Sequence, residues 1–236
     1  MITYASAQRI GTRSHQCDAT ATAAHRGVRA WALLDGIGSS STVQAWTRGN
    51  ARLLARVAAQ TLDPEAAIAA VRAVTDYDGH QDTWEQPPSA VAVVAVRATG
   101  GALRIAWCGD ARAYWKPLGA DAELQQLTRD HNEAERLRAA GFTDFPRQYR
   151  NYVTSSLRRY SGEFGDVGTA RAHGRGRLLL CSDGVYSPFE DNGADLGSVL
   201  NEAADPRAAA TALVCRATAF PAERRDNATA TVVDFG

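Results

Sequence analysis

Lysine is almost absent from this chain: Lys116 is the single lysine among its 26 basic residues, and the others are arginines. The basic residues are matched by 26 acidic ones, so the formal net charge at pH 7 is zero. A neutral balance removes the bulk electrostatic attraction on which binding to nucleic acid depends. We therefore expect no nucleic-acid partner.

Long apolar runs are also missing. No stretch approaches the roughly 18 to 20 apolar residues of a membrane-spanning helix. The N-terminal sequence MITYASAQRIGTR has no basic start followed by an apolar segment, which is the pattern of a signal peptide. We expect a protein that is neither membrane-bound nor secreted, and we predict a cytoplasmic location.

Cysteine is scarce and scattered. The four cysteines are Cys17, Cys108, Cys181 and Cys215, and no two of them have C-x-x-C spacing. This spacing argues against a zinc knuckle and against a disulfide framework. Cys108 and Cys181 each follow an apolar run, where a reduced cysteine behaves as a small hydrophobic residue.

The apolar patterns predict both strands and helices. Two β-rich runs, within residues 89 to 115, flank Gly100 and Gly101, a pair suited to a tight hairpin turn. Further strands are expected at 30–35, 177–183 and 228–235, the last with one buried face because Thr and Val alternate. Helices are expected at 43–60, after the N-cap pairs Asp63-Pro64 and Asp205-Pro206, and at 132–141 with Gly141 as C-cap.

Antiparallel hairpins with helices inserted between them indicate an α+β fold rather than a doubly wound parallel sheet. The sequence shows no internal repeat and no low-complexity linker. We therefore expect a single domain over residues 1 to 236.

Five aspartates stand beside apolar runs or short loops. They are Asp18, Asp35, Asp110, Asp183 and Asp226. Any one of them is readily explained as a turn residue, since Asp-Gly is a common turn signal. All five together favour a shared site, because converging carboxylates repel one another unless cations neutralise them. Oxygen ligands without paired His or Cys indicate Mg²⁺ or Mn²⁺ rather than zinc.

Six short segments resemble, in order, the motifs of the metal-dependent Ser/Thr protein phosphatases, the PPM or type-2C family, of the bacterial type. They are GTRSHQCDA, ALLDGIGSS, CGDARAY, LTRDHN, LLLCSDGVYS and RDNATATVVDF, and together they run over nearly the whole chain. The resemblance implies a four-layer α-β-β-α sandwich, in which two antiparallel sheets face each other and helices cover the outside.

The resemblance also implies a centre of two divalent metal ions, Mn²⁺ or Mg²⁺. Asp35 would bridge the two ions, and the Gly36 carbonyl would add a ligand to one of them. Asp183 and Asp226 would complete the protein ligands of the first ion. Asp18 would serve the second ion through bound water, since Mg²⁺-type ions keep much of their hydration.

Three further residues take roles by the same resemblance. Asp110 matches the position of a third, weaker metal ion. Asn227 would fix Asp226 by hydrogen bonding from the second shell of ligands. Arg13, five residues before Asp18, matches the arginine that binds the substrate phosphate, and its planar guanidinium can hold two phosphate oxygens at once. The residues expected to carry catalysis are therefore Arg13, Asp35 and Asp183.

The implied activity is hydrolysis of phosphoserine and phosphothreonine in proteins, opposing a Ser/Thr protein kinase. A hydroxide bridging the two metal ions would attack phosphorus in line, without a phosphoenzyme, and a metal-bound water is the first choice for the general acid. Two alternatives stay open. One is an inactive relative that binds phosphoproteins or a regulator, and the other is a phosphatase of small phosphorylated metabolites. We expect a monomer.

The sequence departs from the family pattern at several positions. Cys17 replaces a residue that often helps to hold metal-bound water, which bears on the second metal site. Ile37 stands where some members carry a histidine, and Ser39 replaces a third glycine. His131 is expected to be structural. Residues 145–164 interleave arginine with tyrosine, a mixture that could bind single-stranded nucleic acid by stacking. We prefer a basic, aromatic rim for phosphopeptides, with ordinary surface arginines as the alternative.

Overall fold

Two five-stranded antiparallel sheets face each other in the computed structural model, which describes residues 1–77, 87–119, 122–158 and 165–236. One sheet has the order β1-β10-β9-β6-β7, and the other has the order β2-β3-β4-β5-β8. The strands are β1 (Ile2–Arg9), β2 (Ala19–His25), β3 (Val28–Ile37), β4 (Ser89–Ala98), β5 (Leu103–Cys108), β6 (Arg112–Pro117), β7 (Gln125–Gln126), β8 (Gly168–Ala172), β9 (Gly176–Cys181) and β10 (Ala228–Phe235).

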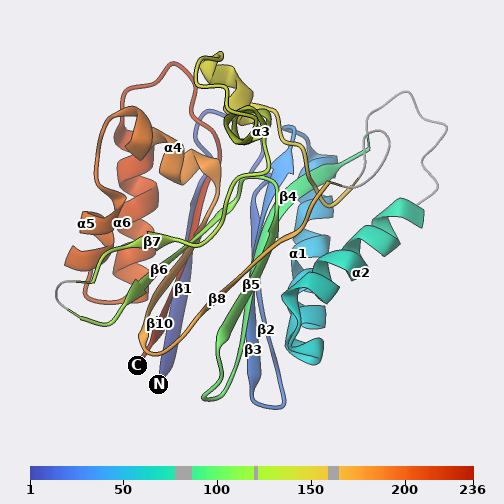
Figure 1. The fold of residues 1–236 in the computed structure, drawn as a ribbon, viewed down its shortest axis with the longest axis vertical. Coiled ribbons are helices and arrows are strands. Elements are labelled where there is room, and N and C mark those ends of the chain that lie inside the picture. The colour runs from blue at the N-terminus through green and yellow to red at the C-terminus, as the bar shows by residue number, and fades with distance from the viewer. Residues whose placement is uncertain (78–86, 120–121, 159–164) are drawn as a thin grey trace.

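Helices cover both outer faces of the sheet pair (Figure 1). Helices α1 and α2 pack on the sheet that contains β2 to β5, and α4 to α6 lie over the sheet that contains β1 and β10. The helices are α1 (Ser41–Thr61), α2 (Pro64–Tyr77), α3 (Glu133–Ala139), the 3-10 helix η2 (Arg147–Asn151), α4 (Asp183–Asp191), α5 (Leu196–Glu202) and α6 (Pro206–Ala219). This arrangement confirms the expected α+β sandwich with four layers.

Three apolar layers hold the four structural layers together. In β3, Trp31 and Leu33 point into the core between the sheets, whereas Leu34 lies on the opposite face, which packs against α1. In β9, Leu178 faces the other sheet and Leu179 faces the helices. A strand buried on both faces needs apolar residues at successive positions, which explains the run LLLC at the end of β9.

The expectation that residues 228–235 have one exposed face was wrong. The threonines of β10 are buried, with Thr229 and Thr231 at most 1% exposed. β10 lies between β1 and β9, and its faces are covered by the other sheet and by α6. The Thr231 hydroxyl is 2.8 Å from the Ser6 hydroxyl, and the Thr229 hydroxyl accepts from the Gln8 amide at 3.1 Å. These hydrogen bonds allow threonine to be buried where periodicity suggests solvent.

The capping residues confirm the predicted helix starts. The Asp63 carboxylate accepts from the backbone amides of Glu65 and Ala66 at 3.0 and 3.1 Å, and the Asp205 carboxylate accepts from Ala208 at 2.8 Å. The hairpin between β4 and β5 is also confirmed, with Gly100 at a φ of +70°. Gly141 has a φ of +88° just after α3, as expected for a C-cap glycine.

The β-rich run after Gly101 is two strands rather than one. β5 ends at Cys108 in one sheet, and β6 begins at Arg112 in the other. The crossing needs Gly109, whose φ is +90° and where a Cβ would lie 2.1 Å from a side-chain carbon of Val91. The next residue, Asp110, is therefore placed where the chain passes from one sheet to the other.

Sequence periodicity did not identify β1, β2 or β8. β1 and β2 carry polar and small residues at alternating positions, and they are the edge strands of their sheets. β1 pairs with β10 over its full length, so the two ends of the chain lie side by side (Figure 1). Among the residues that the structure describes, no helix is long and apolar enough to cross a bilayer.

A candidate metal centre at the end of the sandwich

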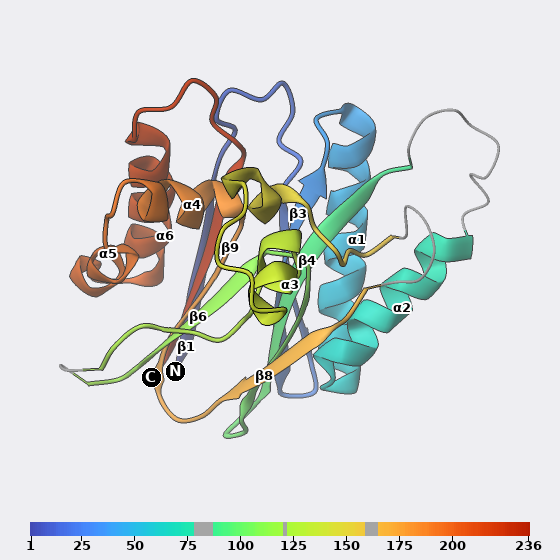
Figure 2. The same cartoon turned by 45° about the horizontal axis from the view of Figure 1, so that its top comes forward.

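The five aspartates arrive from five different segments at one end of the two sheets. Figure 2 shows the loop between β1 and β2, the start of α4 and the loop before β10 at this end. Two of the side chains differ from their expected places. Asp35 lies inside β3, which continues to Ile37, and Asp183 is the first residue of α4 rather than the last of a strand. The positive end of the helix dipole favours an ionised carboxylate at that position.

Electrostatics show that these carboxyl groups act on one another. Burial raises the pKa of Asp18 to about 8 and the pKa of Asp183 to about 6, and the charge of Asp226 adds to both effects. Burial also raises the pKa of Asp35 well above its usual value, reinforced by the charges of the other four aspartates. The pKa of Asp110 rises through burial and the nearby charge of Asp183. The cluster therefore cannot ionise fully without added positive charge.

Asp226 is held by an arginine and by its own neighbour. Its Oδ2 accepts from Arg13 Nη2 at 2.5 Å, and its Oδ1 accepts from the backbone amide of Asn227 at 2.8 Å. The side chain of Asn227 instead accepts from the Cys17 amide at 2.7 Å and donates to the Ile10 carbonyl at 2.8 Å. Asn227 thus fixes Asp226 through its backbone, while its side chain joins the loop before β2 to the loop before β10.

Asp18 is a buried acceptor. Asp18 is 3% exposed, and Ser182 Oγ donates a hydrogen bond to its Oδ2 at 2.8 Å. Gln8 donates to its carbonyl at 3.2 Å, and Gln16 accepts from its amide at 3.1 Å. These bonds to β1 and to the residue before α4 fix the carboxyl group at the centre of the cluster.

The carboxyl oxygens of the aspartates are chemically suited to bind a hard divalent cation, but they are not arranged around a common point. In residues 1–77, 87–119, 122–158 and 165–236, no three Asp, Glu, His or Cys side chains are arranged to hold a metal ion. Three of the carboxyl groups have protein partners: Asp226 with Arg13, Asp18 with Ser182, and Asp183 with Asp35. Oxygen donors with raised pKa values are nevertheless the set that Mg²⁺ or Mn²⁺ would neutralise.

Gly36 is required by packing. A Cβ at this residue would lie 2.6 Å from the Cys17 carbonyl oxygen and 2.8 Å from a Val43 methyl group. The close approach presses β3 against the segment that carries Asp18. Glycine therefore brings Asp18 and Asp35 together, whatever its carbonyl coordinates.

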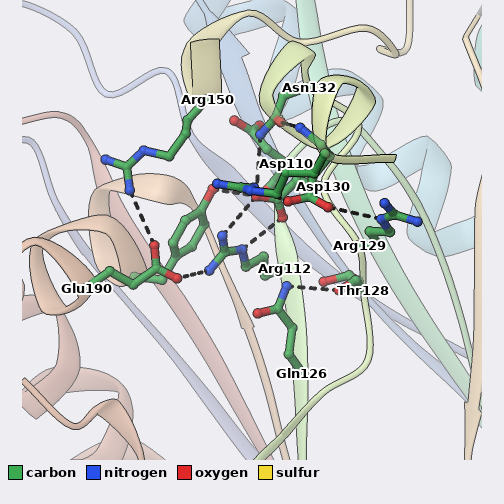
Figure 3. Close-up of polar contacts among 12 residues, drawn as sticks. Asp110, Arg112, Gln126, Thr128, Arg129, Asp130, Asn132, Arg150 and Glu190 are labelled. Carbon is green, nitrogen blue, oxygen red and sulfur yellow. Dashed lines mark hydrogen bonds and ion pairs between the residues drawn. The ribbon is translucent and has the colours of Figure 1, made fainter. Parts of the chain in front are cut away.

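A second network lies beside Asp110 (Figure 3). Arg112 is 7% exposed, and it donates to both carboxylate oxygens of Asp130 at 2.8 Å and to Glu190 at 2.5 Å. Its guanidinium lies 3.6 Å from the centre of the Tyr186 ring, and the Tyr186 hydroxyl donates to the Asp110 carbonyl at 3.0 Å. Burial lowers the pKa of Arg112, but the bond to Asp130 outweighs it, so the pKa is raised and the charge persists.

Sequence reasoning did not single out this network. Arg112 and Asp130 lie in the segments CGDARAY and LTRDHN, which the sequence analysis had already selected. Their positions, two residues after Asp110 and directly before His131, could have marked them as candidates. The ion pair between Arg112 and Asp130, which are 18 residues apart in the chain, could not be predicted from the sequence. His131 itself stacks on Trp107 with ring centres 5.8 Å apart, and its backbone joins Gly109 to Thr154. This placement agrees with a structural role.

The arginines of the segment 145–164 are partly occupied. Arg147 and Arg150 both pair with Asp191 of α4, and Arg150 also lies 3.5 Å from Glu190. The rings of Tyr149 and Tyr152 are 5.7 Å apart. Residues 159–164 lie outside the described residues. Arg147 and Arg150 are therefore held by ion pairs with α4.

The departures from the motif pattern are accommodated without strain. Cys17 is buried, its thiol is 3.6 Å from the Ser40 carbonyl oxygen, and burial raises its pKa. A thiol with a raised pKa stays protonated and is a poor metal ligand. The Ser39 hydroxyl is 3.1 Å from the Ser14 hydroxyl. Ile37 is the last residue of β3 and packs against the core between the sheets.

Comparison with known proteins finds similarity in structure alone. No family model and no curated protein matches the sequence. The serine/threonine phosphatase of S. agalactiae superposes over 100% of both chains with a TM-score of 0.82 and 20% identity. The serine/threonine phosphatase Stp1 of Staphylococcus aureus gives 0.80 over 100% of this chain and 96% of its own, with 19% identity. The catalytic domain of the phosphatase PstP, in complex with 2 manganese ions, gives 0.69 over 99% and 97%, with 23% identity. The chain therefore has the fold of the bacterial PPM-type serine/threonine phosphatases.

Proposed function

We propose that this protein is a metal-dependent phosphatase that hydrolyses phosphoserine and phosphothreonine in proteins. The observation that carries the proposal is the set of buried and half-buried aspartates whose pKa values are raised by burial and by one another's charge. Burying so many carboxyl groups together disfavours their charged forms, and divalent cations would reverse this. The fold shared with the bacterial Ser/Thr phosphatases supports the reaction class.

The proposed ligand assignment keeps the roles that the family resemblance implies. The charges of all four other aspartates act on Asp35. This central position suits a carboxylate that would be shared by two ions. Asp183 and Asp226 would complete the first ion, together with the Gly36 carbonyl. Asp18 would serve the second. The phosphatase PstP, which has the same fold, is in complex with 2 manganese ions, which supports a pair of Mn²⁺ or Mg²⁺ ions here.

Arg13 would change partner during the catalytic cycle. It now pairs with Asp226, and its side chain is 45% exposed at the edge of the cluster. With Asp226 committed to a bound cation, the Arg13 guanidinium would be released from this pair and could hold two oxygens of a substrate phosphate. The charges of Asp183 and Asp35 also act on Arg13.

The chemistry of the centre divides between the ions and the chain. Two bound divalent ions supply an acidic water for in-line attack on phosphorus and positive charge for the oxygens of the phosphoryl group. The chain holds the ligands, with Ser182 fixing Asp18 and the Asn227 amide fixing Asp226. Arg13 would orient the phosphate. Asp110, next to the Arg112 network, would serve a third and weaker metal ion, and a water remains our choice for the general acid.

Chelation followed by metal addition tests the reaction class. The purified protein is treated with a chelator, and hydrolysis of p-nitrophenyl phosphate is measured with Mn²⁺, with Mg²⁺ or with neither. We expect activity with Mn²⁺ or Mg²⁺ and none without a divalent ion. Metal binding without turnover of this ester or of phosphopeptides would instead favour an inactive relative that binds phosphoproteins.

Asp183→Asn tests the ligand assignment. The amide keeps the size of the side chain but removes its charge, so we expect turnover to fall at least about 100-fold and calorimetric Mn²⁺ binding to weaken. Glu202→Gln makes the same chemical change at an exposed residue at the end of α5 and should alter neither quantity. An Asp183→Asn protein with full activity would remove Asp183 from the centre.

Substrate profiling separates a protein phosphatase from a phosphatase of small metabolites. Phosphoserine and phosphothreonine peptides should give a higher kcat/KM than phosphorylated sugars or nucleotides of similar charge. Faster hydrolysis of a small metabolite would support the alternative. A kinase that phosphorylates the same proteins, a cytoplasmic location and a monomeric state remain predictions.

A further inference from the structure

A pocket of about 270 Å³ lies directly beside the acidic centre. Its walls are α4, the end of η2, the C-terminal end of α6 and the loop 221–226, and Asp183 and Asp226 line one end of it. A peptide whose phosphorylated residue reaches the centre would therefore pass the pocket with a neighbouring residue. We propose that this pocket is a specificity subsite that binds an acidic side chain of the substrate, near the phosphorylated residue. The inference rests on the proposed function and adds a substrate class to it.

Arginines supply the positive charge of the pocket. Arg150, Arg224 and Arg225 all line it. In the described parts of the chain, Arg224 and Arg225 form no ion pair, and the Arg225 side chain makes one long hydrogen bond of 3.5 Å to the Phe220 carbonyl. The Nε atoms of Arg150 and Arg225 are buried without a hydrogen-bond acceptor. A guanidinium has five N–H donors, so Arg224 and Arg225 hold further donors that an incoming anion can use.

The acidic residues that line the pocket already interact with other groups of the protein. Asp191 pairs with Arg147 and Arg150. Asp183 and Asp226 belong to the centre, and Asp226 also pairs with Arg13. Figure 3 shows Arg150 directed toward Glu190, so this arginine ties η2 to α4 and closes one wall. The charge left for a ligand is therefore the charge of Arg224 and Arg225, which selects an anion.

The position of Arg225 is set before any ligand arrives. Its backbone carbonyl accepts from the Thr12 amide at 2.9 Å, and its amide donates to the Thr12 hydroxyl at 3.0 Å. The neighbouring loop is equally tight, since a Cβ on Gly11 would lie 2.3 Å from the Asp226 carbonyl oxygen. A fixed backbone reduces the entropy lost when a ligand binds.

The size and lining of the pocket limit what it accepts. Its volume is near the lower end of the range for small-molecule sites, which begins at about 300 Å³. It therefore suits one side chain rather than a whole ligand. Phe220, Pro221 and Ala217 form apolar wall, which lowers the local dielectric and strengthens an arginine–carboxylate pair. A glutamate or aspartate, or a second phosphorylated residue, fits this combination.

The experiment compares phosphothreonine peptides that differ at one position. Glutamate is placed at each of the three positions on either side of the phosphothreonine, and each peptide is matched by one with glutamine there. For the wild-type protein we expect kcat/KM to be about 5- to 10-fold higher for glutamate at one or more positions. A phosphoserine at the best position shows whether the subsite prefers phosphate to carboxylate.

Three variants test the residues. Arg224→Gln, and Arg224→Gln combined with Arg225→Gln, should reduce the glutamate preference to within about 2-fold. Arg207→Gln removes the same charge from an exposed residue at the other end of α6 and should keep the full preference. Because Arg224 is exposed, the single variant also answers the question if the double variant fails to fold.

The outcomes separate the subsite from the reaction. Turnover without a glutamate preference in the wild-type protein, or a preference that survives the double variant, would overturn the subsite and leave the phosphatase intact. If no phosphorylated substrate is turned over, the proposed function fails. In that case, binding of labelled glutamate and glutamine peptides, measured by fluorescence anisotropy, decides the subsite separately: equal binding overturns it, and tighter binding of the glutamate peptide supports it.

Discussion

The buried carboxyl group of Asp18 predicts an unusual dependence of stability on pH. Asp18 is 3% exposed, and burial raises its pKa from 3.8 to about 8. In the absence of metal ions, the folded protein therefore keeps a proton on Asp18 at neutral pH that the unfolded chain has released. Replacing Asp18 by Asn provides a neutral side chain of the same size that can still accept from Ser182.

The sign follows from proton counting. The folded state binds the extra proton between about pH 4 and pH 8, so the contribution of Asp18 to stability is complete below about pH 4. It is lost as the pH rises, by about 1.4 kcal/mol per pH unit. The amide has N–H groups of its own that cost about 1–3 kcal/mol if left unpaired. We therefore expect Asp18→Asn to be close to wild type at pH 5 and more stable by about 3 kcal/mol at pH 8.

Thermal unfolding in chelator, followed by circular dichroism, measures this difference. For a chain of this length, about 3 kcal/mol corresponds to a rise in Tm of roughly 6–12 °C. Saturating Mn²⁺ should reverse the order, because a ligand that binds only the folded state stabilises the wild type more than a variant lacking one carboxylate. A Tm difference in chelator that is the same at pH 5 and pH 8 would refute the reasoning.

The other predictions concern the edge of the centre. Arg13→Ala should chiefly raise KM for phosphorylated substrates, by about 10-fold or more, in steady-state kinetics, because a phosphate ligand is lost; unchanged kinetics would move the phosphate site elsewhere. Arg112→Met should lower the free energy of unfolding by about 3–5 kcal/mol in urea titrations, since it leaves Asp130 buried and unpaired. Adding Asp130→Asn should recover part of that loss, and no recovery would show that the pair is not the cause. Gly36→Ala should weaken calorimetric Mn²⁺ binding, because a Cβ would lie 2.6 Å from a carbonyl oxygen and push Asp35 away; unchanged binding would refute this.

Local sequence signals were sufficient for the elements with strong caps or strong periodicity. Asp63 and Asp205 marked two helix starts because a carboxylate before the first turn satisfies backbone amides in any context. The glycine pair at 100–101 marked a hairpin because a positive φ is needed there. β1 failed as a prediction because an edge strand carries polar residues on more than one face, and no local pattern distinguishes it from a loop.

Residue types and their spacing were enough to predict an acidic centre: five aspartates beside apolar runs, an arginine before the first of them, and a chain without paired cysteines. Those are properties of residue type and local spacing. The pairs of groups that interact became visible in the three-dimensional fold alone, because Arg112 contacts Asp130, Asn227 contacts Cys17, and Arg225 contacts Thr12 across long separations in the chain. Partnerships of this kind depend on how two sheets are stacked and where the chain crosses between them, which no local pattern encodes.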